Sequence, residues 1–132
     1  MVKILVVDDA EFFQKLYASE LIKAGFEVAV ASNGDEAVKM MRENQPKLVL
    51  MDYVMPQATG GDALKQIKAD DTIKNIPVVM LTSIAADIKG EDLLLQGAVA
   101  YLVKDEVQPQ DVVNKVKEIL GTSQAPLDPA AA

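Results

Sequence analysis

The sequence predicts an α/β fold, a doubly wound, five-stranded parallel sheet with five helices on its two faces. Three observations predict it. Five short apolar runs recur along the chain, and each is continuous rather than alternating, as in strands covered on both faces. Segments with helical periodicity lie between the runs, and each connection is long enough for a right-handed crossover between parallel strands. Five strands suit the order 2-1-3-4-5 better than the six-stranded dinucleotide-binding order.

The five expected strands are the apolar runs themselves. They are Val2–Val7, Phe26–Ala31, Leu48–Met51, Val78–Leu81 and Ala98–Val103. Asp8 and Asp9 follow the first run directly, although two adjacent carboxylates repel each other. This pair indicates a site where a further group compensates for the repulsion.

Apolar residues at helical spacing mark the five expected helices. The stripes are Phe13, Leu16, Tyr17, Leu21 and Ala24; Ala37, Val38 and Met41; Leu64 and Ile67; Leu93 and Leu94; and Val112, Val113, Val116, Ile119 and Leu120. Gly25 and Gly121 are placed to end the first and the last helix. Asn33 is a suitable cap for the second, and Pro46 blocks its continuation. Gly90 falls inside the fourth, where glycine costs about 1 kcal/mol relative to alanine and favours a mobile surface, unless it relieves a close packing contact.

Length and composition predict one domain over residues 1–121. The chain has 132 residues, of which 50% are hydrophobic, enough for one domain with a substantial core but not for two domains. Residues 122–132 contain two prolines and no apolar periodicity, so we expect a disordered tail or the stub of a linker.

The charge and the missing residue types exclude several classes of function. A net charge of −7 argues against binding to nucleic acid or to an anionic membrane. Because the chain contains no Cys and no His, any metal must be held by oxygen, which points to Mg²⁺, Mn²⁺ or Ca²⁺. No apolar run approaches the roughly 20 residues of a membrane span, and no signal peptide is evident, so we expect a cytoplasmic protein.

Acidic residues end two strands that the predicted order makes neighbours. Ligands of open parallel sheets bind beyond the carboxyl ends of the strands, where the winding direction reverses. That point lies between the strand before Asp8-Asp9 and the strand before Asp52, about 4.8 Å apart. Two like charges about 4 Å apart cost on the order of 4 kcal/mol at an effective dielectric near 20, and a divalent cation reverses the sign of the interaction. Mg²⁺ fits because it keeps several waters and shares oxygens with phosphate.

The next two strands bring a hydroxyl group and an ammonium group to the same edge. Thr82 and Ser83 end the fourth strand, and Lys104 ends the fifth. A carboxylate such as Asp52 can attack phosphorus, and a hydroxyl and an ammonium can then neutralise the phosphoryl oxygens.

Each of these residues also has a purely structural interpretation. Asp9 could cap the helix that begins near Ala10, and Thr82 could be an ordinary capping residue. Asp52 could start a loop, Lys104 could be a solvated charge, and Tyr101 could be packing. Their joint placement at successive strand ends favours a shared site.

From about Val2 to Leu120 the sequence resembles the receiver domain of two-component response regulators, of the chemotaxis-type, single-domain kind. The resemblance rests on Asp8-Asp9, the segment MDYVMPQATGG around Asp52, Thr82-Ser83, and the YLVK segment that ends at Lys104. It implies a flavodoxin-like fold and a signalling protein that catalyses only its own phosphoryl transfer and dephosphorylation.

The resemblance also implies a role for each residue of the acidic site. Asp52 would accept a phosphoryl group from a sensor histidine kinase or a histidine phosphotransfer protein. Asp9, Asp52 and the backbone carbonyl of Val54 would bind Mg²⁺ directly, and Asp8 partly through water.

The remaining implied roles concern the response to phosphorylation. Lys104 would pair with the phosphoryl group, Thr82 would move to hydrogen-bond it, and Tyr101 would turn into the space vacated. The output surface would be the fourth helix, fifth strand and fifth helix, Ala86–Leu120, which would bind a downstream protein partner. We expect a monomer or a weak, phosphorylation-dependent dimer.

Two departures from the family pattern carry expectations of their own. Asp105 follows Lys104 where receivers usually have proline, so we expect a trans peptide and a different presentation of Lys104. Val54 and Ile84 stand where some receivers carry polar side chains that orient water, so we expect the phosphoryl group to be lost over minutes to hours.

Other functions fit the sequence less well. A phosphatase with Asp52 as nucleophile would need a general acid two residues on, where Val54 stands. A nucleotide or flavin module would need a glycine-rich loop after the first strand, and none is present. A degenerate receiver that acts as a phosphorylation-independent binding module, and the excised receiver of a larger effector protein, both stay open.

Overall fold

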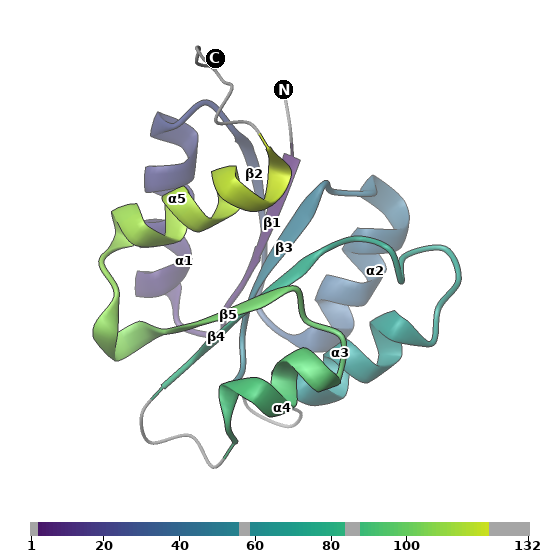
Figure 1. Ribbon diagram of the computed structural model, residues 1–132. Helices are drawn as coiled ribbons and strands as arrows, with labels where there is room; N and C mark the ends of the chain where they lie inside the picture. The colour runs from purple at the N-terminus through teal and green to yellow at the C-terminus, as the bar shows by residue number, and fades with distance from the viewer. Residues whose placement is uncertain (1–2, 56–58, 84–87, 122–132) are drawn as a thin grey trace.

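Five parallel strands form one sheet in the order β2-β1-β3-β4-β5, as predicted. The computed structural model, shown in Figure 1, describes residues 3–55, 59–83 and 88–121. The strands are β1 (Lys3–Val7), β2 (Glu27–Ala31), β3 (Leu48–Asp52), β4 (Val78–Thr82) and β5 (Ala100–Val103). The expected tail at 122–132, Val2, Ile84 and Ala86 lie outside the described residues.

Five α-helices alternate with the strands and cover both faces of the sheet. They are α1 (Glu11–Lys23), α2 (Gly34–Asn44), α3 (Gly60–Lys68), α4 (Gly90–Leu95) and α5 (Pro109–Leu120), and one turn of 3-10 helix, Lys104–Glu106, follows β5. Figure 1 shows α1 and α5 on one face and α2, α3 and α4 on the other. In the part of the chain that the structure describes, every helix is too short or too polar to cross a lipid bilayer.

The sheet separates two hydrophobic cores. Because successive side chains of a strand point to opposite faces, Leu5 and Val7 join the core under α2, α3 and α4, whereas Ile4 and Val6 join the core under α1 and α5. All five residues of β3 and all five of β4 are buried. The continuous apolar runs of the sequence therefore correspond to strands covered on both faces.

The ends of the strands differ from the expectations by one or two residues. β3 includes Asp52 as its last residue, so the acid belongs to the strand itself rather than to the following loop. β5 begins at Ala100 rather than Ala98, because the chain first leaves α4 through Gly97, which has a φ of +114°.

The helix ends follow the predicted signals in most places. The side chain of Asn33 accepts a hydrogen bond of 2.8 Å from the backbone N–H of Glu36, which caps α2 as expected. Gly25 has a φ of +98° in the turn after α1. α2 ends at Asn44, before Pro46 as expected, and its C-cap is Gln45, a non-glycine residue with a φ of 44°.

Gly90 lies in the fourth helix, as predicted, but at its first position. Gly90 is the first residue of α4, after Lys89 at the N-cap, so it does not weaken the interior of the helix. A Cβ built at Gly90 would overlap the ring of Tyr101. The structure therefore supports the alternative that this glycine allows a close packing contact.

Candidate functional site

The predicted acidic residues converge at the carboxyl edge of the sheet. Asp8 and Asp9 follow β1, Asp52 ends the neighbouring β3, and their carboxylates each have an oxygen within 4.8 Å of the others. Thr82 ends β4 beside them, and Lys104 follows β5. These side chains are far apart in the sequence. They lie together because the carboxyl ends of the parallel strands β1, β3, β4 and β5 meet at one edge of the sheet.

Asp8 is the most buried of the three acidic residues. It is 1% exposed, and its Oδ1 accepts a hydrogen bond of 2.9 Å from the backbone N–H of Ala10. Its Oδ2 accepts one of 2.7 Å from Nζ of Lys104. Both carboxylate oxygens of Asp8 are therefore engaged within the protein, which accounts for its complete burial.

Asp9, in contrast, is exposed. The N-cap of α1 is Ala10, and no side chain caps this helix. The alternative interpretation of Asp9 as the helix cap is therefore wrong, and its carboxylate lies at the open side of the acidic cluster.

Asp52 is a buried carboxylate with a raised pKa. It is 6% exposed, and its Oδ1 lies 3.5 Å from Nζ of Lys104. Burial raises the pKa of Asp52 to about 6; Lys104 opposes this rise, and the negative charges of Asp8 and Asp9 add to it. The group is still mostly ionised at neutral pH, as a carboxylate nucleophile requires.

Lys104 reaches the acidic cluster in spite of the residue that follows it. The described chain contains no cis peptide bond, so the Lys104–Asp105 peptide is trans, as expected. With this trans peptide, Nζ of Lys104 still contacts both Asp8 and Asp52, and the side chain of Lys104 is only 12% exposed.

Thr82 brings a buried hydroxyl group to the same edge. The residue is 4% exposed, and its Oγ1 has no hydrogen-bond partner among the described residues. Because the N-cap of α4 is Lys89, Thr82 does not cap that helix. Tyr101 lies on β5, pairs in register with Met80 and is half-buried beside Gly90.

Two further residues shape the site: Gly60, which lies in the MDYVMPQATGG segment but had no predicted role, and Phe13. Gly60 donates a hydrogen bond of 2.7 Å to the carbonyl of Tyr53, and a Cβ at Gly60 would lie 2.5 Å from the backbone oxygen of Asp52. Phe13 lies under Lys104, whose Nζ is 3.9 Å from the centre of its ring. In the sequence, Phe13 is recognisable only as one member of an apolar helical stripe. Val54 is 54% exposed, and because its side chain is a hydrocarbon, only its backbone could provide a ligand atom.

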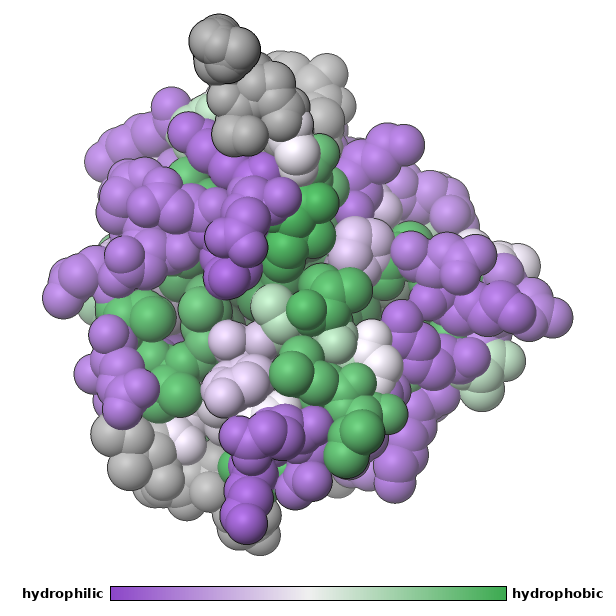
Figure 2. All heavy atoms as spheres, viewed as in Figure 1, coloured by the Kyte–Doolittle hydropathy of each residue, from purple (hydrophilic) through white to green (hydrophobic). Residues whose placement is uncertain are grey.

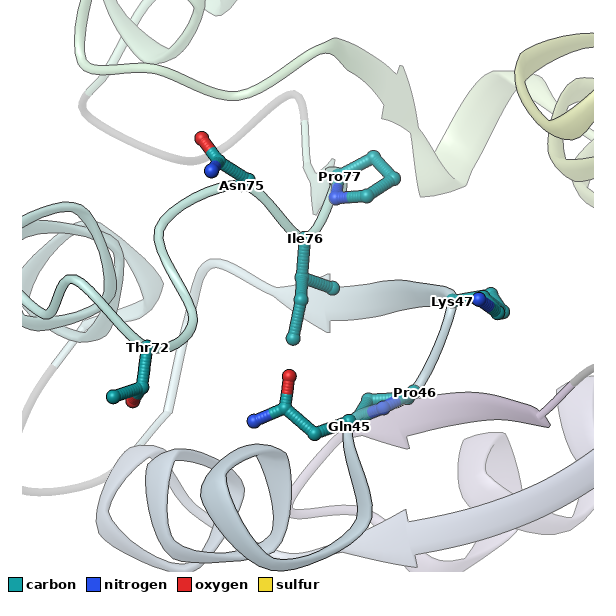
Figure 3. A pocket seen from close by; sticks show the side chains of 7 residues that line it. All are labelled: Gln45, Pro46, Lys47, Thr72, Asn75, Ile76 and Pro77. Carbon is teal, nitrogen blue, oxygen red and sulfur yellow. The ribbon is translucent and has the colours of Figure 1, made fainter.

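A separate cavity lies at the opposite edge of the sheet. It has a volume of about 280 Å³ and is lined by Gln45, Pro46, Lys47, Thr72, Asn75, Ile76 and Pro77. Figure 3 shows the side chains of Gln45 and Ile76 facing one another across it. The residues come from the segments before β3 and β4, at the amino ends of these strands, so the cavity is distinct from the acidic cluster.

The pattern of the response regulator receiver domain matches residues 4–117. The chain belongs to this family. Receiver domains are regulatory proteins that work in two-component signalling, and the match covers both cores and all the site residues described above.

Relatives of this receiver include two single-domain response regulators. The chemotaxis protein CheY of Halobacterium salinarum is 38% identical over 119 residues, which cover 89% of this chain and 96% of the relative. The polar-differentiation response regulator DivK of Brucella anthropi is 32% identical over 118 residues, 89% of this chain and 95% of the relative. The structure of the chemotaxis response regulator CheY4 of Vibrio cholerae superimposes with a TM-score of 0.81 at 28% identity, covering 90% of this chain and 98% of that one.

Proposed function

We propose that this protein is a phosphorylation-activated signalling receiver in which Asp52 accepts a phosphoryl group from a sensor histidine kinase or a histidine phosphotransfer protein. The observation that carries the proposal is the pairing of a buried carboxylate with an ammonium group. Oδ1 of Asp52 lies 3.5 Å from Nζ of Lys104, beside the hydroxyl of Thr82, for which the described part of the chain offers no hydrogen-bond partner. These are the nucleophile, the cation and the donor that phosphoryl transfer requires.

The acidic cluster fits Mg²⁺ as the resident metal ion. Its donors are carboxylate oxygens within 4.8 Å of one another, and this is the ligand type that Mg²⁺ prefers. Asp9 and Asp52 would hold the ion directly with the backbone carbonyl of Val54, and Asp8 would act partly through water. When bound, the ion offsets the negative charge that gathers around Asp52 and the phosphoryl oxygens.

The residues of the chain divide the work of the transfer. A carboxylate oxygen of Asp52 attacks phosphorus, a P–O bond forms, and the P–N bond to the donor histidine breaks with its electron pair going to the imidazole. Lys104, held by Asp8 at 2.7 Å, neutralises a phosphoryl oxygen. The hydroxyl of Thr82 donates a hydrogen bond to another.

The switch that we propose couples this chemistry to the face formed by α4, β5 and α5. Thr82 turns toward the phosphoryl group, and Tyr101 turns inward into the space that Thr82 leaves. Figure 2 shows hydrophobic side chains over α4 and the turn into β5, where Leu95 is 85%, Val99 48% and Leu94 42% exposed. An exposed apolar group of this kind supports a surface that binds a protein partner.

The wider assignment follows from the same proposal. The receiver spans residues 1–121. It acts as a regulator in the cytoplasm rather than as an enzyme on other substrates, as a monomer or a weak phosphorylation-dependent dimer. The net charge of −7 supports a protein target rather than direct contact with nucleic acid or membrane.

Incubation with Mg²⁺ and acetyl phosphate, followed by intact mass spectrometry, tests the proposal. We expect one added phosphoryl group on the wild-type protein and none on Asp52→Asn. Asp71→Asn, which changes an aspartate whose side chain is 90% exposed, is the matched control and should be phosphorylated normally. An unmodified wild-type protein, or an equal adduct on Asp52→Asn, would refute the assignment.

A further inference from the structure

The ammonium group of Lys104 has a third neighbour besides the two carboxylates. Nζ lies 2.7 Å from Oδ2 of Asp8, 3.5 Å from Oδ1 of Asp52 and 3.9 Å from the centre of the Phe13 ring. The side chain of Lys104 is 12% exposed. The cation therefore sits over an aromatic face, at a distance typical of a cation–π contact.

The Phe13 ring is itself fixed by its neighbours on α1. It stacks on Tyr17, one turn further along the helix, with ring centres 5.9 Å apart and an interplanar angle of 19°. Phe12 meets it edge to face at 5.2 Å. Tyr17 is 4% exposed and belongs to the core under α1 and α5, to which Phe13 also packs. The ring thus links that core to the ammonium group.

An aromatic face suits this position better than a charged or polar side chain. A third carboxylate beside Lys104 would add negative charge to a cluster that already holds three acids and must accept a phosphoryl group. A ring attracts the cation without adding net charge and keeps water from that side. Lys104 lies closer to Asp8 than to Asp52, so a fixed surface under the ammonium group also limits how far it can follow Asp8 or turn to solvent.

We propose that Phe13 is a positioning residue for phosphoryl transfer: its ring face holds the ammonium group of Lys104 between Asp8 and Asp52. The effect on transfer rests on the proposed function, whereas the contact itself exists in the unphosphorylated protein. A role in core packing alone would depend on the shape of residue 13 and not on the electrons of its ring, and this difference can be measured.

The first test observes the contact without phosphorylation. In NMR spectra of the unphosphorylated protein, the ε-protons of Lys104 should be shielded by the ring current of Phe13. Phe13→Leu should remove this shielding and Phe13→Tyr should keep it. Ile22→Ala, which changes a 57% exposed apolar residue further along α1, is the matched control and should leave it in place. Lys104 ε-protons at the position of a solvated lysine in the wild-type protein would overturn the proposal.

The second test measures the rate of phosphorylation by acetyl phosphate at saturating Mg²⁺. Phe13 is replaced by phenylalanines with one, two and three ring fluorines, which keep the shape of the side chain and weaken the negative potential of its face. We expect a graded fall in rate that reaches about three- to tenfold, with Phe13→Leu at the low end, Phe13→Tyr near the wild type and Mg²⁺ affinity unchanged.

The outcomes separate the two proposals. A wild-type protein that is phosphorylated at the same rate as every fluorinated variant and as Phe13→Leu overturns the role of Phe13 and leaves the proposed function standing. A wild-type protein that takes up no phosphoryl group overturns the proposed function, and the positioning role falls with it.

Discussion

At Asp52, burial acts against the charge that the proposed chemistry needs. Its pKa is raised to about 6, first by burial and then by Asp8 and Asp9, against the opposing effect of Lys104. The ordinary value is 3.8, so between about pH 4 and pH 6 the folded protein binds more protons than the unfolded chain. Stability therefore falls as the pH rises through this interval and stays at the lower level above it.

Asp52→Asn should for this reason stabilise the metal-free protein at pH 7. We expect a gain of about 1–2 kcal/mol in the free energy of unfolding, less than the full change in pKa would give because solvent at the open side of the cluster screens the charge. The gain should disappear below about pH 4, and urea unfolding without Mg²⁺ at several pH values measures it. A variant less stable than the wild type at pH 7 would contradict this explanation of the raised pKa.

Gly60 places the first residue of α3 directly against the end of β3. A Cβ there would lie 2.5 Å from the backbone oxygen of Asp52 and 2.9 Å from Cα of Tyr53. Gly60→Ala should therefore destabilise the protein by about 1–3 kcal/mol, because backbone atoms cannot yield as a flexible side chain does.

Gly61→Ala is the matched control for that substitution. A Cβ at Gly61 would meet only side-chain atoms, the closest at 3.2 Å, so we expect a smaller loss in the same urea experiment. Equal stabilities for the two variants would show that the backbone at Asp52 tolerates movement, contrary to the structure.

At the scale of elements, Gly90 of α4 packs directly against the ring of Tyr101 on β5. Gly90→Ala should cost about 1–3 kcal/mol of stability, since a Cβ would overlap the ring of Tyr101. In a Tyr101→Ala background the same substitution should cost little, because the ring is gone. A double-mutant cycle of chemical unfolding measures the difference as an interaction energy, expected to be on the order of 1–2 kcal/mol. An interaction energy near zero would mean that Gly90 serves another purpose.

The sequence is most informative where one physical signal acts alone. The runs that became β3 and β4 are continuous and apolar because helices cover both faces, and their length of five residues each is typical of a strand and too short for a buried helix. It is less informative at the ends of elements, as at Ala98 and Ala100, where the conformation of Gly97 decides. The need for glycine at the first position of α4 could not be predicted, because the ring that Gly90 packs against belongs to Tyr101 on β5.

The same distinction holds in the site. The acids could be placed together from the strand order, since the carboxyl ends of parallel strands meet at one edge. That Asp8 is buried and Asp9 exposed could not be predicted, because both residues follow β1. The difference depends on the hydrogen bonds that the Ala10 backbone and Lys104 donate to Asp8. Phe13 under Lys104 joins residues far apart in the sequence, and no local pattern encodes this contact.

At the scale of the whole molecule, the acidic cluster concentrates part of a net charge of −7 at one edge of the sheet. A ligand that binds only the folded protein stabilises it by about 2.7 kcal/mol at a hundred times its Kd. Mg²⁺ at that level should therefore raise the Tm by roughly 10 °C, as thermal unfolding followed by circular dichroism would measure.

Asp9→Asn tests where the ion binds in that experiment. Because Asp9 is exposed, the variant should fold, yet Mg²⁺ should raise its Tm little or not at all. Asp92→Asn changes an exposed acid in the first turn of α4 and should respond to Mg²⁺ as the wild type does. An undiminished Mg²⁺ effect in Asp9→Asn would locate the ion elsewhere.

A crystal structure grown with Mg²⁺ and beryllium trifluoride, an analogue of the phosphoryl group, tests the central claim most directly. We expect the beryllium atom to be bonded to a carboxylate oxygen of Asp52, with Lys104 and Thr82 contacting its fluorine atoms and a cation held by Asp9, Asp52 and the carbonyl of Val54. A structure in which Asp52 carries no beryllium trifluoride, or in which Lys104 stays on Asp8 and turns away from the bound group, would contradict the proposed function.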